Sequence, residues 1–309
     1  MPYSSIIIVL FDDFNRQLDN IESETPLKIS KMNKKKGIVG CIRLIAWFII
    51  LETFLHLFSV NEIQSLNPEI FKTLKPHVLF TIGIFSGGFF YLKYLFIFGL
   101  PIYFAKLDEM IPPRKPVCAF TIARFSNVWR GFDRGLYQFM LRQIYIPFLQ
   151  VRSKFLFLKY VLSLLMPFVF VLIWHGTSTK YLVWVTFSIV DLIVEKIGIS
   201  FGKSNLWKKI KLNIGEANGY RLKAAFCVFS VVPGLFGIVS FLVREKNSEL
   251  IAYKIIIEGI MDIVNGTWLT DIYSPGFCFI YLVIFSYFYS HTCLYFEEKE
   301  TVKRKKKLE

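Results

Sequence analysis

Six stretches of about 20 mainly apolar residues limit what this chain can fold into more than any other feature, because each can cross a bilayer as one helix. They lie near residues 38–60, 78–105, 154–174, 180–199, 223–243 and 275–296. The last contains no Asp, Glu, Lys or Arg, whereas the others carry one to four of these residues. A segment that crosses lipid must satisfy its backbone polar groups internally, as a helix does. We therefore predict an all-α, multi-pass transmembrane helical bundle.

The composition and charge of the chain agree with a membrane location. Hydrophobic residues make up 54% of the sequence and Phe occurs 33 times, which is more than the core of a soluble domain needs. The net charge of +14 raises the question of nucleic acid, but no nucleic-acid-binding module is present. Lys and Arg beside apolar spans instead orient helices and meet lipid headgroups. We expect the bilayer, and not nucleic acid, as their partner.

Two further segments mix charged and aromatic residues and are predicted to be amphipathic. They are residues 128–150 and 250–264, which either lie at the interface or enter the membrane as re-entrant helices. No repeat or low-complexity linker divides the chain, so we predict one membrane-embedded domain over residues 1–309. Its end, residues 297–309, is a basic tail, which favours a cytosolic C-terminus.

The five cysteines are odd in number and widely spaced, and no CxxC motif occurs. This pattern argues against a disulfide framework and against a zinc site, and no metal ion is predicted. Four of the cysteines lie in or beside apolar runs, where a thiol usually behaves as a small hydrophobic group. The exception is Cys118, which follows a loop with three prolines, IPPRKPVC.

Among the four histidines, His175 has the position that best suits catalysis. It ends an apolar span and is followed at once by glycine and small polar residues, so its imidazole can face a cavity and act as a general base. Position alone leaves a packing role equally open. For His56, His77 and His291, which lie in or beside spans, packing is the commoner role.

The acidic candidates are Asp133, in RGFDRGLYQF, and the pair Asp191 and Glu195. The pair lies four residues apart on one helix face, where it is either catalytic or bound to a neighbouring helix. Asp133 lies between Arg130 and Arg134, which either form a salt bridge with it or keep it charged beside a cavity. No GxSxG, Walker A, HExxH or GxGxxG motif supports the commoner soluble chemistries.

The stretch VWRGFDRGLYQFMLRQIYIP, followed by a span that ends LIWHG, resembles the membrane-bound O-acyltransferase family. That family pairs a polar residue in an aromatic, Arg-rich segment with a histidine at a helix end, here Asp133 and His175, 42 residues apart. The segments KYLFIFGLPIYFAKLDEMIPPRKPVC and GTWLTDIYSPGFCFIYLVIFSYFYSH, and Asp in place of Asn, are similar to the hedgehog acyltransferase branch. With gaps, the similarity covers most of residues 3–296.

This resemblance implies a fold, a reaction and two catalytic residues. The fold would be the family's helical bundle without its first spans, because residues 3–18 are similar to a stretch that lies well inside family members. The reaction would be palmitoyl transfer from palmitoyl-CoA to the N-terminal cysteine of a secreted, hedgehog-like protein. His175 would be the catalytic base, and Asp133 would position the incoming amine or the histidine.

The same resemblance implies several binding residues. Cys118 matches a cysteine that ligates haem in that branch, and Trp129 and Trp174 would shape the reaction chamber. The phosphates of acyl-CoA are anionic and need cations, which guanidinium and ammonium groups can supply. The candidates for that contact are Arg130, Arg134, Arg142 and the basic segment 202–223.

Two alternative functions remain open, and a motif near the end of the chain predicts where in the cell the protein lies. The acceptor could be a lipid or serine hydroxyl, although Asp rather than Asn at position 133 argues against this. A shortened paralogue could instead bind acyl-CoA or substrate without catalysis, although the presence of both Asp133 and His175 argues against that. Lys306 and Lys307 occupy the positions of a dilysine retrieval signal, which predicts the endoplasmic reticulum membrane and again a cytosolic C-terminus.

Overall fold

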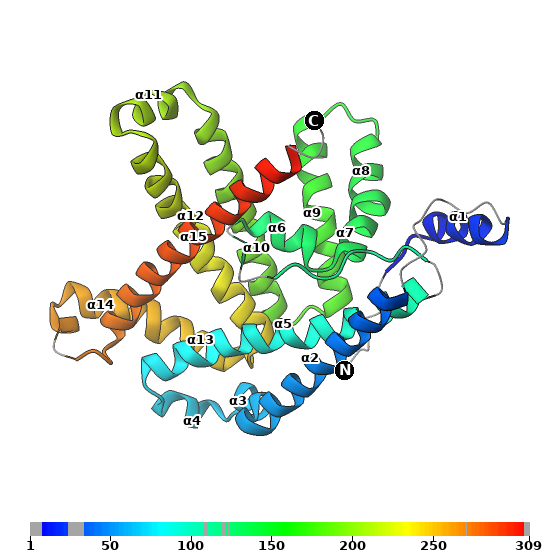
Figure 1. Cartoon of the computed structure of the whole chain (residues 1–309). Helices are drawn as coiled ribbons and strands as arrows, with labels where there is room; N and C mark the ends of the chain where they lie inside the picture. The colour runs from blue at the N-terminus through cyan, green and yellow to red at the C-terminus, as the bar shows by residue number, and fades with distance from the viewer. Residues whose placement is uncertain are drawn as a thin grey trace. The chain divides into compact units, whose positions relative to one another are not determined.

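The computed structural model shows only helices as regular elements in the part of the chain it describes, so the all-α prediction is confirmed (Figure 1). It describes residues 8–23, 34–107, 110–118, 121–122, 124–269 and 271–305. The α-helices are α1 (Phe11–Glu22), α2 (Lys34–Phe58), α3 (Val60–Ser65), α4 (Pro68–Thr73), α5 (Pro76–Leu107), α6 (Phe125–Gly131), α7 (Arg134–Phe139), α8 (Ile146–Gln150), α9 (Leu156–His175), α10 (Thr179–Lys203), α11 (Asn205–Ile214), α12 (Glu216–Leu242), α13 (Glu245–Ala252), α14 (Glu258–Val264) and α15 (Pro275–Lys305). Two π-helical turns, Met140–Tyr145 and Tyr253–Ile257, and a 3-10 turn, Thr267–Leu269, lie between them.

Five of the helices within the described ranges are long and apolar enough to cross a membrane. The spans are Ile38–Phe58, Pro76–Lys106, Leu156–His175, Glu216–Leu242 and Pro275–Lys299, which correspond to five of the six predicted ones. The sixth predicted stretch does form a helix, α10, but it is too polar to qualify by composition. Asp191, Glu195 and Lys196 lie close together within it. The predicted multi-pass architecture is confirmed with this one correction.

The chain forms two compact units, each assembled from separate segments. The first unit contains Met1–Ser59, Phe89–Val117 and Trp129–His175, and the second contains Val60–Gly88, Cys118–Val128 and Gly176–Glu309. Helices α5 and α6 each contribute one part to each unit. A single domain over residues 1–309 stays a prediction. Lys306 and Lys307, and the first residues of the similar stretch 3–18, lie outside the described residues.

In the first unit, α2 packs closely on the second half of α5 because each helix offers a glycine at the contact. The Tyr103 ring covers Gly40, where an added Cβ would overlap it, and an added Cβ at Gly99 would lie 2.7 Å from the Leu44 side chain. Small residues let membrane helices approach closely and gain van der Waals contact, which replaces the hydrophobic drive that lipid does not provide. Large apolar side chains on the other faces of α2 and α9 are exposed, as expected for lipid contact.

In the second unit, α12 packs against both α10 and α15. Its buried positions include a run of small residues, which allows these helices to pack closely. The buried core of the unit consists of Phe71, Leu79, Phe236, Val239, Val243, Ile251, Ile255 and Leu282. Pro233 lies inside α12, and a proline there is tolerated because neighbouring helices can satisfy the backbone group that it leaves free.

Candidate active site

Asp133 caps the start of the short helix α7. Its backbone is extended, with φ −117° and ψ 91°, and its Oδ1 accepts a hydrogen bond of 2.9 Å from the Leu136 N–H. An acceptor at this position satisfies one of the free N–H groups of the first turn. Burial raises the pKa of the Asp133 carboxyl above its usual range, and backbone hydrogen bonds from Leu136 and Gly135 oppose part of that rise.

The arginines beside Asp133 in sequence are not its partners. Asp133, Arg130 and Arg134 all lie in the described part of the chain, and no ion pair joins the carboxylate to either guanidinium. The structure therefore shows neither the local salt bridge nor the carboxylate kept charged by arginines that the sequence suggested. The desolvated carboxyl is held instead by the backbone of α7.

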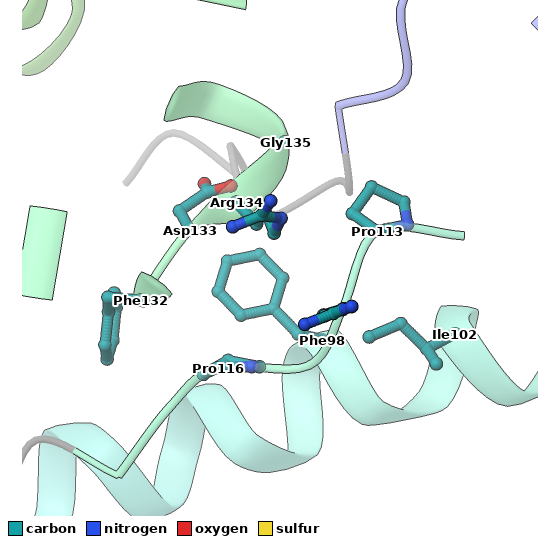
Figure 2. Close-up of a pocket in the computed structure, with 9 residues that line it drawn as sticks. Phe98, Ile102, Pro113, Pro116, Phe132, Asp133, Arg134 and Gly135 are labelled. Atoms are coloured by element: carbon teal, nitrogen blue, oxygen red, sulfur yellow. The ribbon is translucent and has the colours of Figure 1, made fainter. Parts of the chain in front are cut away.

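A small recess opens beside Asp133, and the Phe98 ring projects between the start of α7 and the adjacent loop (Figure 2). Its lining comes from α5, the loop 110–118 and the start of α7: Phe98, Ile102, Pro113, Arg114, Pro116, Phe132, Asp133, Arg134 and Gly135. The sequence predicts an anion-binding role for Arg134, and the structure adds Arg114 beside it. Nothing in the run IPPRKPVC distinguishes Arg114 from Lys115, and only the fold brings it to the recess.

Phe132, the residue before Asp133, is held by aromatic side chains of α5. Its ring stacks on Phe90 at 5.4 Å, lies 5.4 Å from Tyr94, and meets Phe98 edge-on at 6.4 Å. Such ring pairs add stabilisation beyond the buried area alone. The backbone that carries Asp133 is thereby fixed against α5.

His175 is the last residue of α9, and the helix ends there because Gly176 has a φ of 105°, which favours glycine. The imidazole is half-buried. The neighbouring Trp174 ring lies 5.9 Å from Phe170, which in turn lies 5.4 Å from Phe139 at the end of α7. The π-helical turn Met140–Tyr145, which continues α7, packs against α9. The fold therefore brings the segment that Asp133 caps against the helix that ends in His175, within one unit.

The other predicted binding residues of this unit have different surroundings. The Trp129 ring meets Phe168 of α9 edge-on at 5.4 Å, and Arg130 is exposed. Arg142 is also exposed, but its Nη1 lies 2.9 Å from Asp13 Oδ2 in α1. An anionic ligand at Arg142 would have to compete with Asp13, and no sequence signal links two residues that lie 129 positions apart.

Gly135 marks a close approach of the N-terminal segment to α7. An added Cβ would overlap the carbonyl oxygen of Ile8 and lie 3.1 Å from the Ile8 N and C atoms. The contact is to backbone, so a rotamer change cannot relieve it. Only glycine lets residue 8 pass over the first turn of α7, directly after Asp133.

Gly135→Ala is therefore expected to destabilise the protein by about 1–3 kcal/mol, in the range of overpacked interiors. The matched control is Gly198→Ala in α10, where an added Cβ meets nothing within 4 Å. Alanine is the better helix former, so the control should be neutral or more stable, by up to about 1 kcal/mol. Thermal unfolding of both variants in the same detergent checks this. Equal midpoints for the two variants would contradict the close approach at Gly135.

The second unit gives the pair Asp191 and Glu195 separate roles. Both oxygens of Glu195 are engaged by Ser126 at the start of α6, one by its N–H at 2.8 Å and one by its hydroxyl at 2.6 Å. Glu195 is thus a cap for a neighbouring helix. Asp191 is fully buried, and neither of its oxygens has a hydrogen-bond partner among the described residues.

Cys118 belongs to the second unit and lies half-buried in the loop before α6. Its carbonyl accepts hydrogen bonds from the Thr121 N–H at 3.0 Å and from the Thr121 hydroxyl at 2.9 Å, which forms a turn. The Tyr289 hydroxyl of α15 donates to the Ile122 carbonyl at 2.8 Å and anchors this turn. A half-buried thiol beside an aromatic helix suits a thiolate ligand of haem in its donor chemistry.

Comparison with known proteins gives one family. Residues 15–206 match the model of MBOAT, the membrane-bound O-acyltransferase family. The chain is 27% identical over 222 residues to protein-cysteine N-palmitoyltransferase Rasp of Drosophila melanogaster. This alignment covers 72% of the chain and 44% of the relative. It is 32% identical over 188 residues to protein-cysteine N-palmitoyltransferase HHAT of Mus musculus. That alignment covers 61% of the chain and 36% of the relative.

A third relative carries a different name. The chain is 25% identical over 190 residues to membrane-bound O-acyltransferase GUP1 of Millerozyma farinosa. The alignment covers 61% of the chain and 35% of the relative. The chain thus spans less than half the length of these curated relatives. The family match nevertheless covers more than half of the chain and includes the stretch from Asp133 to His175. This chain therefore belongs to the membrane-bound O-acyltransferase family.

Proposed function

We propose that the protein transfers palmitate from palmitoyl-CoA to the N-terminal amine of a secreted, hedgehog-like protein that begins with cysteine. The observation that carries this proposal is the packing of the segment that Asp133 caps, α7 with the π-helical turn Met140–Tyr145 that continues it, against α9, which ends in His175, inside a member of an acyltransferase family. Two relatives named protein-cysteine N-palmitoyltransferase support the choice of acyl group and acceptor.

In the proposed reaction, the acceptor amine attacks the thioester carbonyl, so that a C–N bond forms and the C–S bond breaks. His175 takes the proton that the attacking nitrogen loses and returns one to the departing thiolate of CoA. Asp133 positions the amine. Its raised pKa brings the exchange of its proton closer to neutral pH than in an exposed aspartate, as groups in active sites often require.

Further residues are proposed to bind the acyl-CoA donor and a haem group. Arg130 and Arg134 are candidates for the CoA phosphates, and Trp129 and Trp174 for the walls of the chamber. Burial of the acyl chain would contribute about 0.8 kcal/mol per methylene. Cys118 would hold haem through its thiolate. When bound in this way, haem iron can take up or release an electron.

The test uses the purified full chain in lipid nanodiscs with alkyne-labelled palmitoyl-CoA and a peptide that begins with cysteine. The expected product carries the label in an amide bond, which hydroxylamine does not cleave. The matched control is the same peptide with an acetylated N-terminus, which should not form that product. Labelling of the acetylated peptide to the same extent, or no labelling of any peptide, would contradict the proposal.

O-acyl transfer to a lipid or serine hydroxyl is the second candidate, and the similarity to membrane-bound O-acyltransferase GUP1 favours it. A mixture of lysophospholipid, glycerol lipid and an N-acetylated peptide with an internal serine separates the two candidates, because these acceptors offer only hydroxyl groups and an ester product is cleaved by hydroxylamine. If palmitoyl-CoA binds but no acceptor is labelled, the protein is a binding or regulatory relative instead.

The proposal also includes the location of the protein in the cell. We infer an endoplasmic reticulum membrane protein with a cytosolic C-terminus. The basic tail beside the uncharged end of the last span and the adjacent Lys306 and Lys307 support this orientation and address.

A further inference from the structure

The start of α12 and the end of α15 lie side by side in the second unit. The Tyr220 hydroxyl donates to the His291 carbonyl at 2.9 Å, and Lys223 Nζ lies 3.6 Å from Glu298 Oε1. Helix α11 directly precedes α12 in the chain, as Figure 1 shows. The two contacts therefore place the α11 end of α12 and the C-terminal end of α15 at the same end of this unit.

That end of the unit is strongly basic. Residues 203–223 contain six Lys and Arg residues and a single acidic residue, Glu216. Residues 244–271, which lie between the opposite ends of α12 and α15, contain three basic and five acidic residues. Because Lys and Arg collect on the cytosolic side of membrane proteins, this asymmetry places α11 on the cytosolic side.

Three lysines at this end are not used inside the protein. Lys211 pairs with Glu216 at 2.5 Å, and Lys223 lies beside Glu298. Lys203, Lys208 and Lys209 are exposed, and within the described part of the chain their ammonium groups form no ion pair or hydrogen bond. They are therefore available for an external anion.

Helix α11 also exposes leucines beside these lysines. Leu206 and Leu212 are 59% and 84% exposed, and Lys209 lies between them at the three-residue spacing of one helix face. Trp207 packs on Phe201 of α10 at 5.7 Å, so the helix is held in place while this stripe faces outward. A soluble anion such as CoA would use the lysines but would leave the leucines in water.

We propose that α11 lies in the headgroup layer of the cytosolic leaflet and binds anionic phospholipids. Lys208 and Lys209 contact the lipid phosphates, and Leu206 and Leu212 enter the boundary with the acyl chains. Lys209 lies between the two leucines, but its long aliphatic stem lets the ammonium reach the phosphates while the leucines enter the apolar boundary. The cytosolic leaflet is the one that carries anionic lipid. Lipid binding by α11 does not depend on the proposed transferase activity.

The test compares the full chain in nanodiscs of phosphatidylcholine with and without phosphatidylserine. The variant is Lys208→Gln/Lys209→Gln, and the matched control is Arg152→Gln/Lys154→Gln, which removes two exposed cations of the loop between α8 and α9. Phosphatidylserine should raise the unfolding midpoint of the wild type and the control. In the variant the shift should fall by at least half, and the phosphatidylserine retained in native mass spectrometry should fall several-fold.

A second arm separates lipid from CoA as the source of phosphate. The affinity for CoA in pure phosphatidylcholine should be the same in the variant and the wild type. If it falls, the lysines serve the donor and the proposal is wrong. The absence of any midpoint shift with phosphatidylserine in the wild type, or a full shift in the variant, would also overturn it.

Discussion

His175→Ala is expected to lower palmitoyl transfer by a factor of about 10²–10⁴, the usual contribution of a positioned general base. The attacking amine must lose a proton as the C–N bond forms, and alanine cannot accept it. The measurement is the rate of amide-linked product at saturating palmitoyl-CoA and peptide. Binding of palmitoyl-CoA should be little changed, because the imidazole acts on the acceptor and on the leaving group.

The matched control for this variant is His56→Ala. His56 is exposed on α2, and its Nδ1 lies 2.9 Å from the Glu52 carbonyl of the same helix. This variant should retain most of the activity. Both proteins should also unfold near the wild-type midpoint, since α9 is terminated by Gly176 and not by the histidine. A folded His175→Ala protein with wild-type activity would remove His175 from the proposed reaction.

Asp133→Asn and Asp133→Ala should separate the chemical role of the carboxyl from its structural role. Asparagine retains an oxygen that can accept from Leu136 N–H, so this variant should keep the cap of α7 and fold normally. Alanine loses the cap, which costs about 1 kcal/mol of stability. If the carboxyl positions the amine, both variants should lose most of the activity, and only the alanine variant should also unfold earlier.

The pH dependence of stability checks the state of the same carboxyl. Its pKa is raised above the ordinary value of 3.8 by burial, so between the two values the folded protein holds the proton more tightly than the unfolded chain. Stability therefore falls as the pH rises from 3.8 through the raised pKa. Asp133→Asn removes this contribution. As the pH rises through that interval, the free energy of unfolding of the variant should therefore increase relative to that of the wild type. Parallel pH profiles would contradict the raised pKa.

The sequence predicted most of the fold because membrane helices are determined locally. A run of about 20 apolar residues can satisfy its backbone in lipid only within itself, so five spans follow without any knowledge of their neighbours. Helix α10 shows where this argument stops. Its helical form followed from the sequence. That Asp191 is fully buried, and that Glu195 accepts hydrogen bonds from Ser126 at the start of α6, depends on distant segments that pack against α10.

The candidate site, like the fold, could be predicted from the sequence only in part. The motif identified Asp133 and His175, and Gly176 after the histidine already indicated a helix end. The sequence could not show that Asp133 caps α7 without an arginine partner, that Arg114 reaches its recess, or that Asp13 occupies Arg142. The first depends on what surrounds the carboxyl, and the other two are contacts between separate segments of the chain. A local pattern specifies which residues form a helix, but only the packed fold decides which charges meet and which carboxyl loses its water.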